Sequence, residues 1–173
     1  MKSSPASPKK NPADLARLYA RPGFLLRRAQ QISSAVFEDA CRELDLTPAQ
    51  FGILTVLQAH PGMGQSSLAR ALGFDKVTVL RVLRGLEARG LVTRELSDDN
   101  RRNVSVNLTA DGALLLRQAQ KPAEEAYRRL MAPLDKQQQA QLIELLQLLT
   151  GELEEEARAA FVRPPVPAPR QAA

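Results

Sequence analysis

Apolar residues recur with a helical period in two long stretches near opposite ends of the chain. The first runs from Phe24 to about Leu44 and carries Leu25, Ala29, Ile32 and Val36 on one helix face. The second follows Asp135, and its leucines repeat at spacings of three and four residues: Leu142, Leu145, Leu146, Leu149 and Leu153. This spacing predicts two amphipathic helices, each with a broad apolar face.

Capping residues and proline mark further helices between these two. Thr47 is a good N-cap for a helix over about 48–60, whose first residue is a proline. Another long helix is expected to start at Thr109 and to reach about residue 131. Pro122 is predicted to kink or interrupt it, because proline lacks the backbone N–H and clashes with the preceding turn.

The stretch from Gln65 to Arg89 predicts two helices around a tight turn. Gly73 suits the turn because glycine tolerates φ > 0, and Asp75 is a good N-cap for the second helix. Gly90 is a natural stop for that helix. The positions expected to face the core are Leu68, Ala69 and Leu72 on the first helix, and Val79, Leu83 and Leu86 on the second.

After Gly90 the pattern changes to that of strands. Residues 91–96 and 103–109 are predicted strands, since apolar residues such as Val104 and Val106 alternate there with polar ones. The polar turn between the strands ends in Arg101 and Arg102. Two helices around a turn, followed by a hairpin, predict a winged helix-turn-helix. The expected fold class is therefore mainly α with a small β-wing.

Charge is distributed unevenly around a net value of +5. The first 28 residues hold seven basic residues and one acid, whereas residues 123–156 hold eight acids and three basic residues. This asymmetry favours a protein that presents one surface to a polyanion, and a solvated charge pattern without a partner is the alternative. Neither a membrane-spanning run nor a signal-peptide core is apparent, so we expect a cytoplasmic protein without a membrane partner.

No enzyme is predicted. One histidine, His60, allows neither a His-containing triad nor a multi-histidine metal site, and one cysteine, Cys41, allows no internal disulfide. A glycine-rich phosphate loop is also missing. We therefore expect no catalytic residue, no metal site and no cofactor. Acidic neighbours of Cys41 would raise its pKa, which disfavours oxidant sensing by this thiol.

Four short motifs give the chain a family resemblance: LTPAQF at 46–51, LARAL at 68–72, LEARGLV at 86–92 and LTADG at 108–112. Through them, residues 23–149 resemble the MarR (multiple antibiotic resistance regulator) family of bacterial repressors. One departure lies in the wing, where the family pattern places an aspartate two residues before the arginine that corresponds to Arg102. Asn100 occupies that position here, with Asp99 beside it.

The resemblance implies two lobes within one domain at residues 13–162. The winged helix-turn-helix lobe would cover about 47–109, and a helical dimerisation lobe would take helices at about 22–45 and 110–161. We expect disordered tails at 1–12, which is basic, and at 163–173, which is rich in proline.

The terminal helices also predict a homodimer, because a winged lobe is too small to cover their apolar faces. The alternative is a helical lobe within a monomer. A dimer would present two recognition helices to a palindromic operator on double-stranded DNA.

DNA contacts are expected from three places. Residues at the start of the recognition helix should reach base edges, the helix before it should hold phosphates, and the wing should enter the minor groove. The candidate residues are Ser66, Ser67, Lys76, Val77, Thr78, Arg81, Arg84, Asn100, Arg101 and Arg102.

Arg28 is the candidate for binding a small-molecule effector. It falls at the edge of the apolar face of the first long helix, where it could meet an anionic ligand or could extend into solvent. Phe24 and Phe51 are candidates for the wall of this site, although core packing is the commoner role for such residues. The segment 21–28 also resembles the MarR subgroup that controls aromatic-acid catabolism and responds to aromatic acids or their coenzyme A thioesters.

The predicted function is a homodimeric, DNA-binding transcriptional repressor that a small ligand releases. A DNA-binding regulator without an effector is one alternative. The other is a winged helix that serves only protein–protein interaction, which the basic residues of the recognition helix and wing disfavour.

Overall fold

A computed structural model describes the backbone of residues 12–97 and 100–165, and the side chains of 14–95 and 104–165. Its elements in chain order are α1 (Pro12–Tyr19), α2 (Pro22–Ala40), η1 (Arg42–Leu44), α3 (Pro48–Ala59), β1 (Met63–Gly64), α4 (Gln65–Leu72), α5 (Lys76–Ala88), β2 (Val92–Ser97), β3 (Asn100–Leu108), α6 (Ala110–Met131), α7 (Lys136–Glu152) and η2 (Glu154–Glu156). The predicted fold class, mainly α with a small β-wing, is confirmed.

Capping side chains set the start of four helices. Thr47, Asp75, Thr109 and Asp135 each accept a hydrogen bond from the backbone N–H three residues later, at distances of 2.8 to 3.3 Å. These bonds satisfy amide groups that the first helical turn leaves without partners. Each of these four residues was a predicted start, so these helix boundaries are confirmed.

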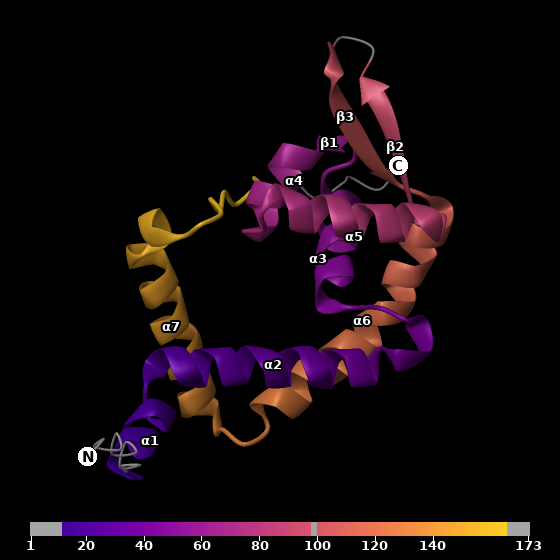
Figure 1. The fold of residues 1–173 in the computed structure, drawn as a ribbon. Coiled ribbons are helices and arrows are strands. Elements are labelled where there is room, and N and C mark those ends of the chain that lie inside the picture. Colours follow the sequence, from indigo (N-terminus) through magenta and orange to yellow (C-terminus); the bar gives the residue numbers. More distant parts are fainter. Residues whose placement is uncertain (1–11, 98–99, 166–173) are drawn as a thin grey trace, which may run out of the picture.

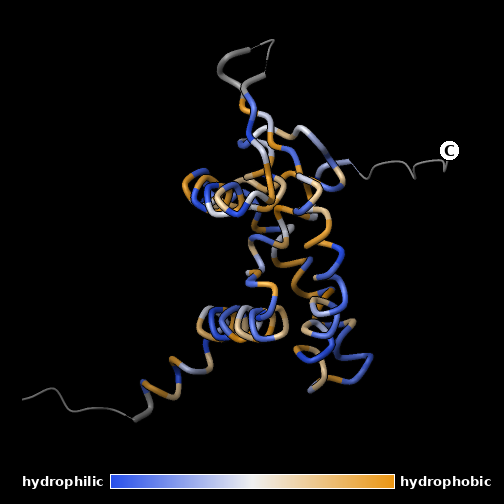
Figure 2. Tube along the Cα trace, turned by 90° about the vertical axis from the view of Figure 1, so that its right-hand side faces the viewer, coloured by the Kyte–Doolittle hydropathy of each residue, from blue (hydrophilic) through white to orange (hydrophobic). Residues whose placement is uncertain are grey.

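The sheet is small and antiparallel, with strand order β1-β3-β2. Strands β2 and β3 form the predicted hairpin, in which Val92 pairs with Leu108. Strand β1 was not predicted; its two residues pair with β3, and Met63 lies opposite Val106. Figure 2 shows the hairpin as a thin wing that projects beyond the helical body.

The core lies where α3 meets α5, the sheet and α6. Its fully buried side chains include Ile53, Leu54, Leu57, Leu68, Leu83 and Leu86. Helix α6 crosses α2 with small residues at the contact, since Ala119, Ala123 and Ala126 are buried. Small side chains let two helix backbones approach closely, and this contact joins the winged lobe to α2 (Figure 1).

One predicted helix end and one predicted interruption were wrong. The first long helix ends at Ala40 instead of about Leu44, because the chain turns through η1 and takes a left-handed conformation at Asp45, with φ of 46°. Of the two outcomes predicted at Pro122, a kink or an interruption, the interruption is wrong, since α6 is continuous through this residue. Burial of the alanines on either side offsets the one hydrogen bond that proline removes.

Helix α7 is almost without partners. None of its residues is buried, and it ends at Glu152, earlier than the predicted 161. In Figure 1 it stands apart from α3 and α6, and the chain after η2 leads from its end to α4. The predicted tails lie mostly outside the described residues, which omit 1–11 and 166–173; Pro12 begins α1.

Candidate nucleic-acid interface

The turn between α4 and α5 has the geometry that its sequence predicts. Gly73 adopts a left-handed conformation with φ of 62°, and the N–H of Phe74 donates to the carbonyl of Ala69 at 2.9 Å. This arrangement closes the C-terminus of α4 and redirects the chain within three residues. Helix α5 therefore begins at a defined angle to α4.

Asp75 fixes the first turn of α5. Its carboxylate accepts one hydrogen bond from the backbone N–H of Thr78 at 2.8 Å and another from the Thr78 hydroxyl at 2.7 Å. These two bonds, the backbone one foremost, hold the pKa of Asp75 below its ordinary value. The hydroxyl of Thr78, a predicted DNA contact, thus donates to the cap, and its oxygen still has a lone pair to offer.

Helix α5 divides into a buried face and an exposed, basic face. Val79, Leu83 and Leu86 are buried, whereas Lys76, Arg81 and Arg84 are exposed. Val77 lies on the exposed face with 77% of its surface accessible. An apolar side chain that contributes nothing to the core, flanked by cations, suits contact with a base edge such as a thymine methyl group.

Helix α4 presents a second part of the candidate interface. Its inner side is buried through Leu68, Ala69 and Ala71. Ser66 is exposed and Ser67 is half-buried at the first turn, where backbone N–H groups lack helical partners. Hydroxyl and amide donors at this position suit phosphate oxygens.

Arg94 braces the wing against α5, a role that our sequence analysis missed. Its Nε donates to Glu87 Oε2 at 2.8 Å, and its Nη2 donates to the same oxygen. This bond holds the pKa of Glu87 below its ordinary value. The sequence pattern that could have predicted this ion pair is the acid Glu87 before the turn at Gly90 and the arginine Arg94 after it.

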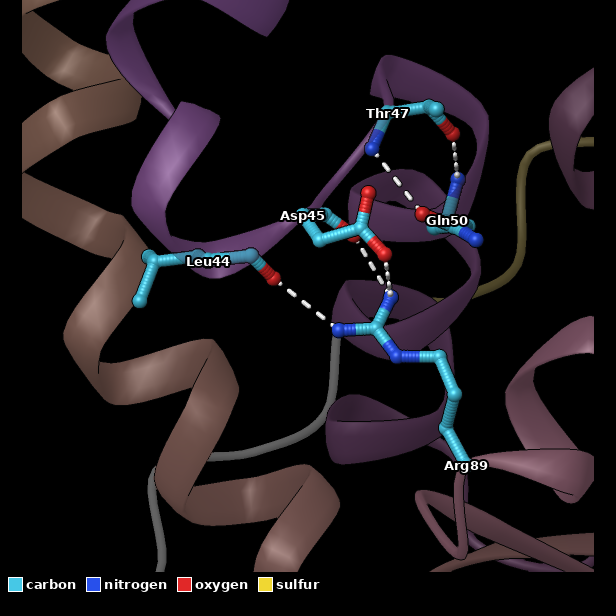
Figure 3. Close-up of polar contacts among 5 residues, drawn as sticks. All are labelled: Leu44, Asp45, Thr47, Gln50 and Arg89. Atoms are coloured by element: carbon cyan, nitrogen blue, oxygen red, sulfur yellow. Dashed lines mark hydrogen bonds and ion pairs between the residues drawn. The ribbon is translucent and has the colours of Figure 1, made fainter.

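Arg89 makes a second unpredicted connection, from the end of α5 to the last residue of η1 and the residue after it (Figure 3). Its Nη1 donates to the carbonyl of Asp45 at 2.6 Å, and its Nη2 donates to the carbonyl of Leu44 at 2.9 Å. One guanidinium therefore holds two consecutive carbonyls, the second of which belongs to the left-handed residue Asp45. The segment that joins α2 to α3 is thus tied directly to the end of α5.

The predicted wing contacts Asn100, Arg101 and Arg102 belong to strand β3, which pairs with β2. Their side chains lie outside the described residues. Their contribution to DNA binding accordingly stays a prediction.

The three predicted ligand residues do not meet within the single chain. Phe51 packs against Phe37, with 5.4 Å between ring centroids, in the core. Phe24 instead contacts Tyr19 and lies under the guanidinium of Arg27. With a rise of about 1.5 Å per residue, Phe24 lies about 20 Å from Phe37 along α2. Arg28 is exposed and donates to Gln31 at 3.0 Å.

Other candidate chemistry finds little support in the part of the chain that the structure describes. Cys41 is buried, and burial raises its pKa, which opposes formation of a reactive thiolate. Residues 12–97 and 100–165 contain no group of three or more His, Cys, Asp or Glu residues placed to hold a metal. Over the same ranges, no helix has the length and apolar character needed to cross a membrane.

Comparison with known proteins identifies this architecture. The MarR family model matches residues 46–104, which run from just before α3 to the middle of the second wing strand, β3. A putative transcriptional regulatory protein for the hcr operon of Thauera aromatica is 31% identical, over 73% of this chain and 77% of that protein. This chain belongs to the MarR family.

Solved structures of MarR-family relatives extend the likeness beyond the winged lobe. BpsR of Bordetella bronchiseptica, described with regulation of its DNA binding by 6-hydroxynicotinic acid, is 30% identical with a TM-score of 0.71, over 76% of this chain and 94% of that one. The repressor CouR bound to a 23-mer DNA duplex is 31% identical with a TM-score of 0.71, over 82% of this chain and 99% of that one. The family and these relatives are transcriptional regulators, not enzymes.

Proposed function

We propose that this MarR-family protein is a homodimeric cytoplasmic repressor that binds a palindromic operator and is released by a small anionic aromatic ligand or its coenzyme A thioester. In this proposal the base edges of the DNA are contacted by Lys76, Val77, Thr78, Arg81 and Arg84. The phosphates are contacted by Ser66 and Ser67. The minor groove is entered by Arg102, with Asn100 and Arg101 nearby.

The observation that carries the DNA-binding assignment is the exposed face of α5. Val77, Arg81 and Arg84 lie on the side of the helix opposite its buried residues, and they follow a helix start fixed by Asp75. Arginine can pair with two acceptors of guanine in the major groove, and valine can pack against a thymine methyl. CouR, which shares this fold, is described as bound to a DNA duplex.

Support for the dimer comes from apolar surface that one chain leaves uncovered. Leu145, Leu146 and Leu149 of α7 are 38–62% exposed, and α2 exposes Leu25 and Ile32 to a similar degree. Leucine-rich helix faces of this size are stable in water only when another apolar surface covers them. A second copy of the same helices supplies that surface and places two copies of α5 for a palindrome.

Support for the ligand class comes from Arg28 and from one relative. Phe24, Arg28 and Ile32 lie one helical turn apart along α2, so a cation sits within the stripe that a partner would cover. Covering a cation is favourable only if an anion or water meets it. For BpsR, 6-hydroxynicotinic acid, an anionic aromatic compound, regulates DNA binding.

A mobility-shift series tests this function. A duplex selected from a random pool by the full-length chain is titrated at salt concentrations from about 50 to 200 mM, where phosphate neutralisation gives a steep loss of affinity. We expect Arg81→Ala to weaken binding to the selected duplex by about 1–3 kcal/mol and to weaken random DNA much less. Aromatic carboxylates, 6-hydroxynicotinate among them, are then added to the complex.

Each rival gives a different result in this series. A winged helix used only for protein–protein contacts would select no duplex and show no salt slope. A regulator without an effector would bind the duplex with the expected slope, and no aromatic acid or thioester would release it. Equal losses on selected and random DNA for Arg81→Ala would make this residue a phosphate contact.

A further inference from the structure

The chain after α7 forms a strap, residues 157–163, that docks on the helix-turn-helix. After η2 the backbone becomes extended at Ala157. The N–H of Phe161 donates to Glu154 Oε1 at 2.7 Å, and the N–H of Val162 donates to the carbonyl of Arg70 in α4 at 2.9 Å. A side-chain atom of Phe161 also lies 3.9 Å from the position that a Cβ on Gly73 would take. The strap is thus held both at its base and on α4.

Docking of the strap creates a cationic cleft next to the candidate interface. The cleft has a volume of about 410 Å³ and is lined by Ser66 and Arg70 of α4, Lys76 of α5 and Arg158 of the strap. Three of these side chains are cations. The single acid on the lining is Asp75, whose carboxylate oxygens already accept hydrogen bonds from Thr78.

The three cations are available for an external anion. Arg70, Lys76 and Arg158 are exposed, and none of them forms an ion pair within the described residues. Two residues of the cleft, Ser66 and the cation Lys76, already belong to the proposed DNA contacts. An anion held here therefore lies in continuity with the interface formed by α4 and α5.

We infer that this cleft binds a phosphate of the DNA backbone and that Arg158, carried by the strap, is a contact of the repressor with DNA. This inference rests on the proposed function. Exposed cations hold an isolated anion weakly in water, but they bind a polyanion through the release of its counterions. The contacts of α4 and α5 would bring a phosphate of the DNA backbone to this open, cationic cleft. The cleft should therefore bind that phosphate more tightly than it binds a free phosphate ion.

Arg158→Gln tests the contact. Each neutralised phosphate adds about 0.9 to the slope of log affinity against log salt, so losing one contact in each subunit of a dimer should lower the slope by about 1.8. The loss should be the same on selected and random duplexes, because phosphates carry no sequence information. Arg163→Gln is the matched control, since it removes the same charge from the same strap, at a different cleft lined by residues of α7.

Val162→Pro tests whether docking of the strap is required. It removes the N–H that donates to Arg70, whereas Val162→Ala keeps it. We expect the proline variant to reproduce the lower slope of Arg158→Gln, the alanine variant to match the parent, and the double variant Arg158→Gln with Val162→Pro to lose nothing more. Circular dichroism at each step checks that the fold is retained.

The outcomes separate this inference from the function on which it rests. If the parent binds no DNA, the proposed function fails. If Arg81→Ala loses specific binding but Arg158→Gln leaves the slope unchanged, or Arg163→Gln lowers it equally, only the assignment of Arg158 fails. If inorganic phosphate raises the melting temperature of the parent above that in chloride of equal ionic strength, but does not do so for Arg158→Gln, the cleft is a free-anion site and not a DNA contact.

Discussion

Gly112 shows how closely the wing and α6 pack at a single residue. A Cβ at this position would lie 2.1 Å from the carbonyl oxygen of Leu91 and 3.3 Å from the side chain of Leu108. Because the nearest atom belongs to the backbone, it cannot rotate away, and either the residue that precedes β2 or helix α6 must move.

Overpacking of a core usually costs about 1–3 kcal/mol. We predict that Gly112→Ala destabilises the protein by at least this much. Gly85→Ala is the control, since nothing lies within 4 Å of its added Cβ, and alanine in a helix interior is favoured over glycine by about 0.5–1 kcal/mol. The two substitutions should move the midpoint of urea denaturation in opposite directions, to lower urea for Gly112→Ala and to higher urea for Gly85→Ala. A neutral Gly112→Ala would mean that α6 can move away from the wing without cost.

Asp75 makes the start of the recognition helix sensitive to acid. Its pKa is lowered in the folded chain, so ionisation stabilises the fold above the ordinary carboxyl pKa of 3.8, and this stability is lost as pH falls through the folded value. Asp75→Asn retains an acceptor for the Thr78 N–H but does not titrate. The stability of the Asp75→Asn variant, measured by urea midpoints, should therefore fall less than that of the parent between neutral pH and pH about 3. If the stabilities of the variant and the parent fall in parallel with pH, the Asp75 carboxylate does not have this role.

At the scale of elements, Arg89 links α5 to the segment between α2 and α3, and this link has a geometric requirement. Its two nitrogens bind the carbonyls of Leu44 and Asp45 at once, and its ion pair with the Asp45 carboxylate is longer, at 3.8 Å. Lysine can supply the charge but not two donors in a fixed fork.

We predict that Arg89→Ala costs about 1.5–3 kcal/mol of stability, the usual range for a hydrogen bond to a charged group, and that Arg89→Lys recovers only part of it. Asp45→Gly should be neutral or stabilising, because glycine takes the left-handed conformation without strain. Full recovery by lysine would show that charge alone matters at this connection. Because α2 lies in the proposed dimer base, Arg89→Ala should also weaken the effect of ligand on DNA binding.

The elements whose signals are local were predictable from sequence. Thr47, Asp75, Thr109 and Asp135 act within their own first helical turn, so the starts of four helices followed from single residues. The inward and outward positions of α5 followed from its periodicity.

Features that depend on distant partners were not predictable. Strand β1 is only two residues long and exists because β3 pairs with it. The partners of Arg89 lie 44 and 45 residues away in the chain. Phe51 carries the same local pattern whether it faces a ligand or the core, and contact with Phe37 from another helix decides its position. The strap was expected to be helical up to residue 161, because no local sequence pattern predicts the hydrogen bond from the Val162 N–H to the carbonyl of Arg70.

At the scale of the whole molecule, the two lobes differ in how much of themselves they bury. The winged lobe encloses a core with fully buried leucines, whereas α7 buries none of its residues. A single chain therefore leaves its α7 leucines in water, a state that favours association.

We predict that the double substitution Leu146→Ala and Leu149→Ala dissociates the dimer at concentrations where the parent remains dimeric, since each buried leucine lost costs about 2–5 kcal/mol. Sedimentation velocity at micromolar protein measures the change. Gln141→Ala with Gln147→Ala is the matched control on the same helix and should stay dimeric. A parent chain that sediments as a monomer would overturn the assembly.

The proposed ligand control would have to act on the proposed dimer as a whole, because a single chain does not bring Phe24, Arg28 and Phe51 together. A ligand releases DNA only if it binds more tightly to a dimer whose recognition helices are wrongly spaced for the operator. Arg28 lies in the stripe of α2 that the partner would cover, so an aromatic acid bound there can alter how α2 meets the winged lobe. Leu44 and Asp45 follow α2 through η1, so their hydrogen bonds to Arg89 would carry such a change to the end of α5.

We therefore expect Arg28→Ala to bind the selected duplex almost as the parent does and to require more aromatic acid for release. Loss of a coupling of about 1–3 kcal/mol corresponds to roughly a 5- to 150-fold higher ligand concentration. Arg117→Ala is the control, because it removes the same charge from an exposed position on α6, outside that stripe. Titration of ligand into the protein–DNA complex, followed by fluorescence anisotropy, measures the shift. If Arg28→Ala releases DNA at the same concentration as the parent and the control, the carboxylate of the ligand is held by another residue and Arg28 is a solvated surface cation.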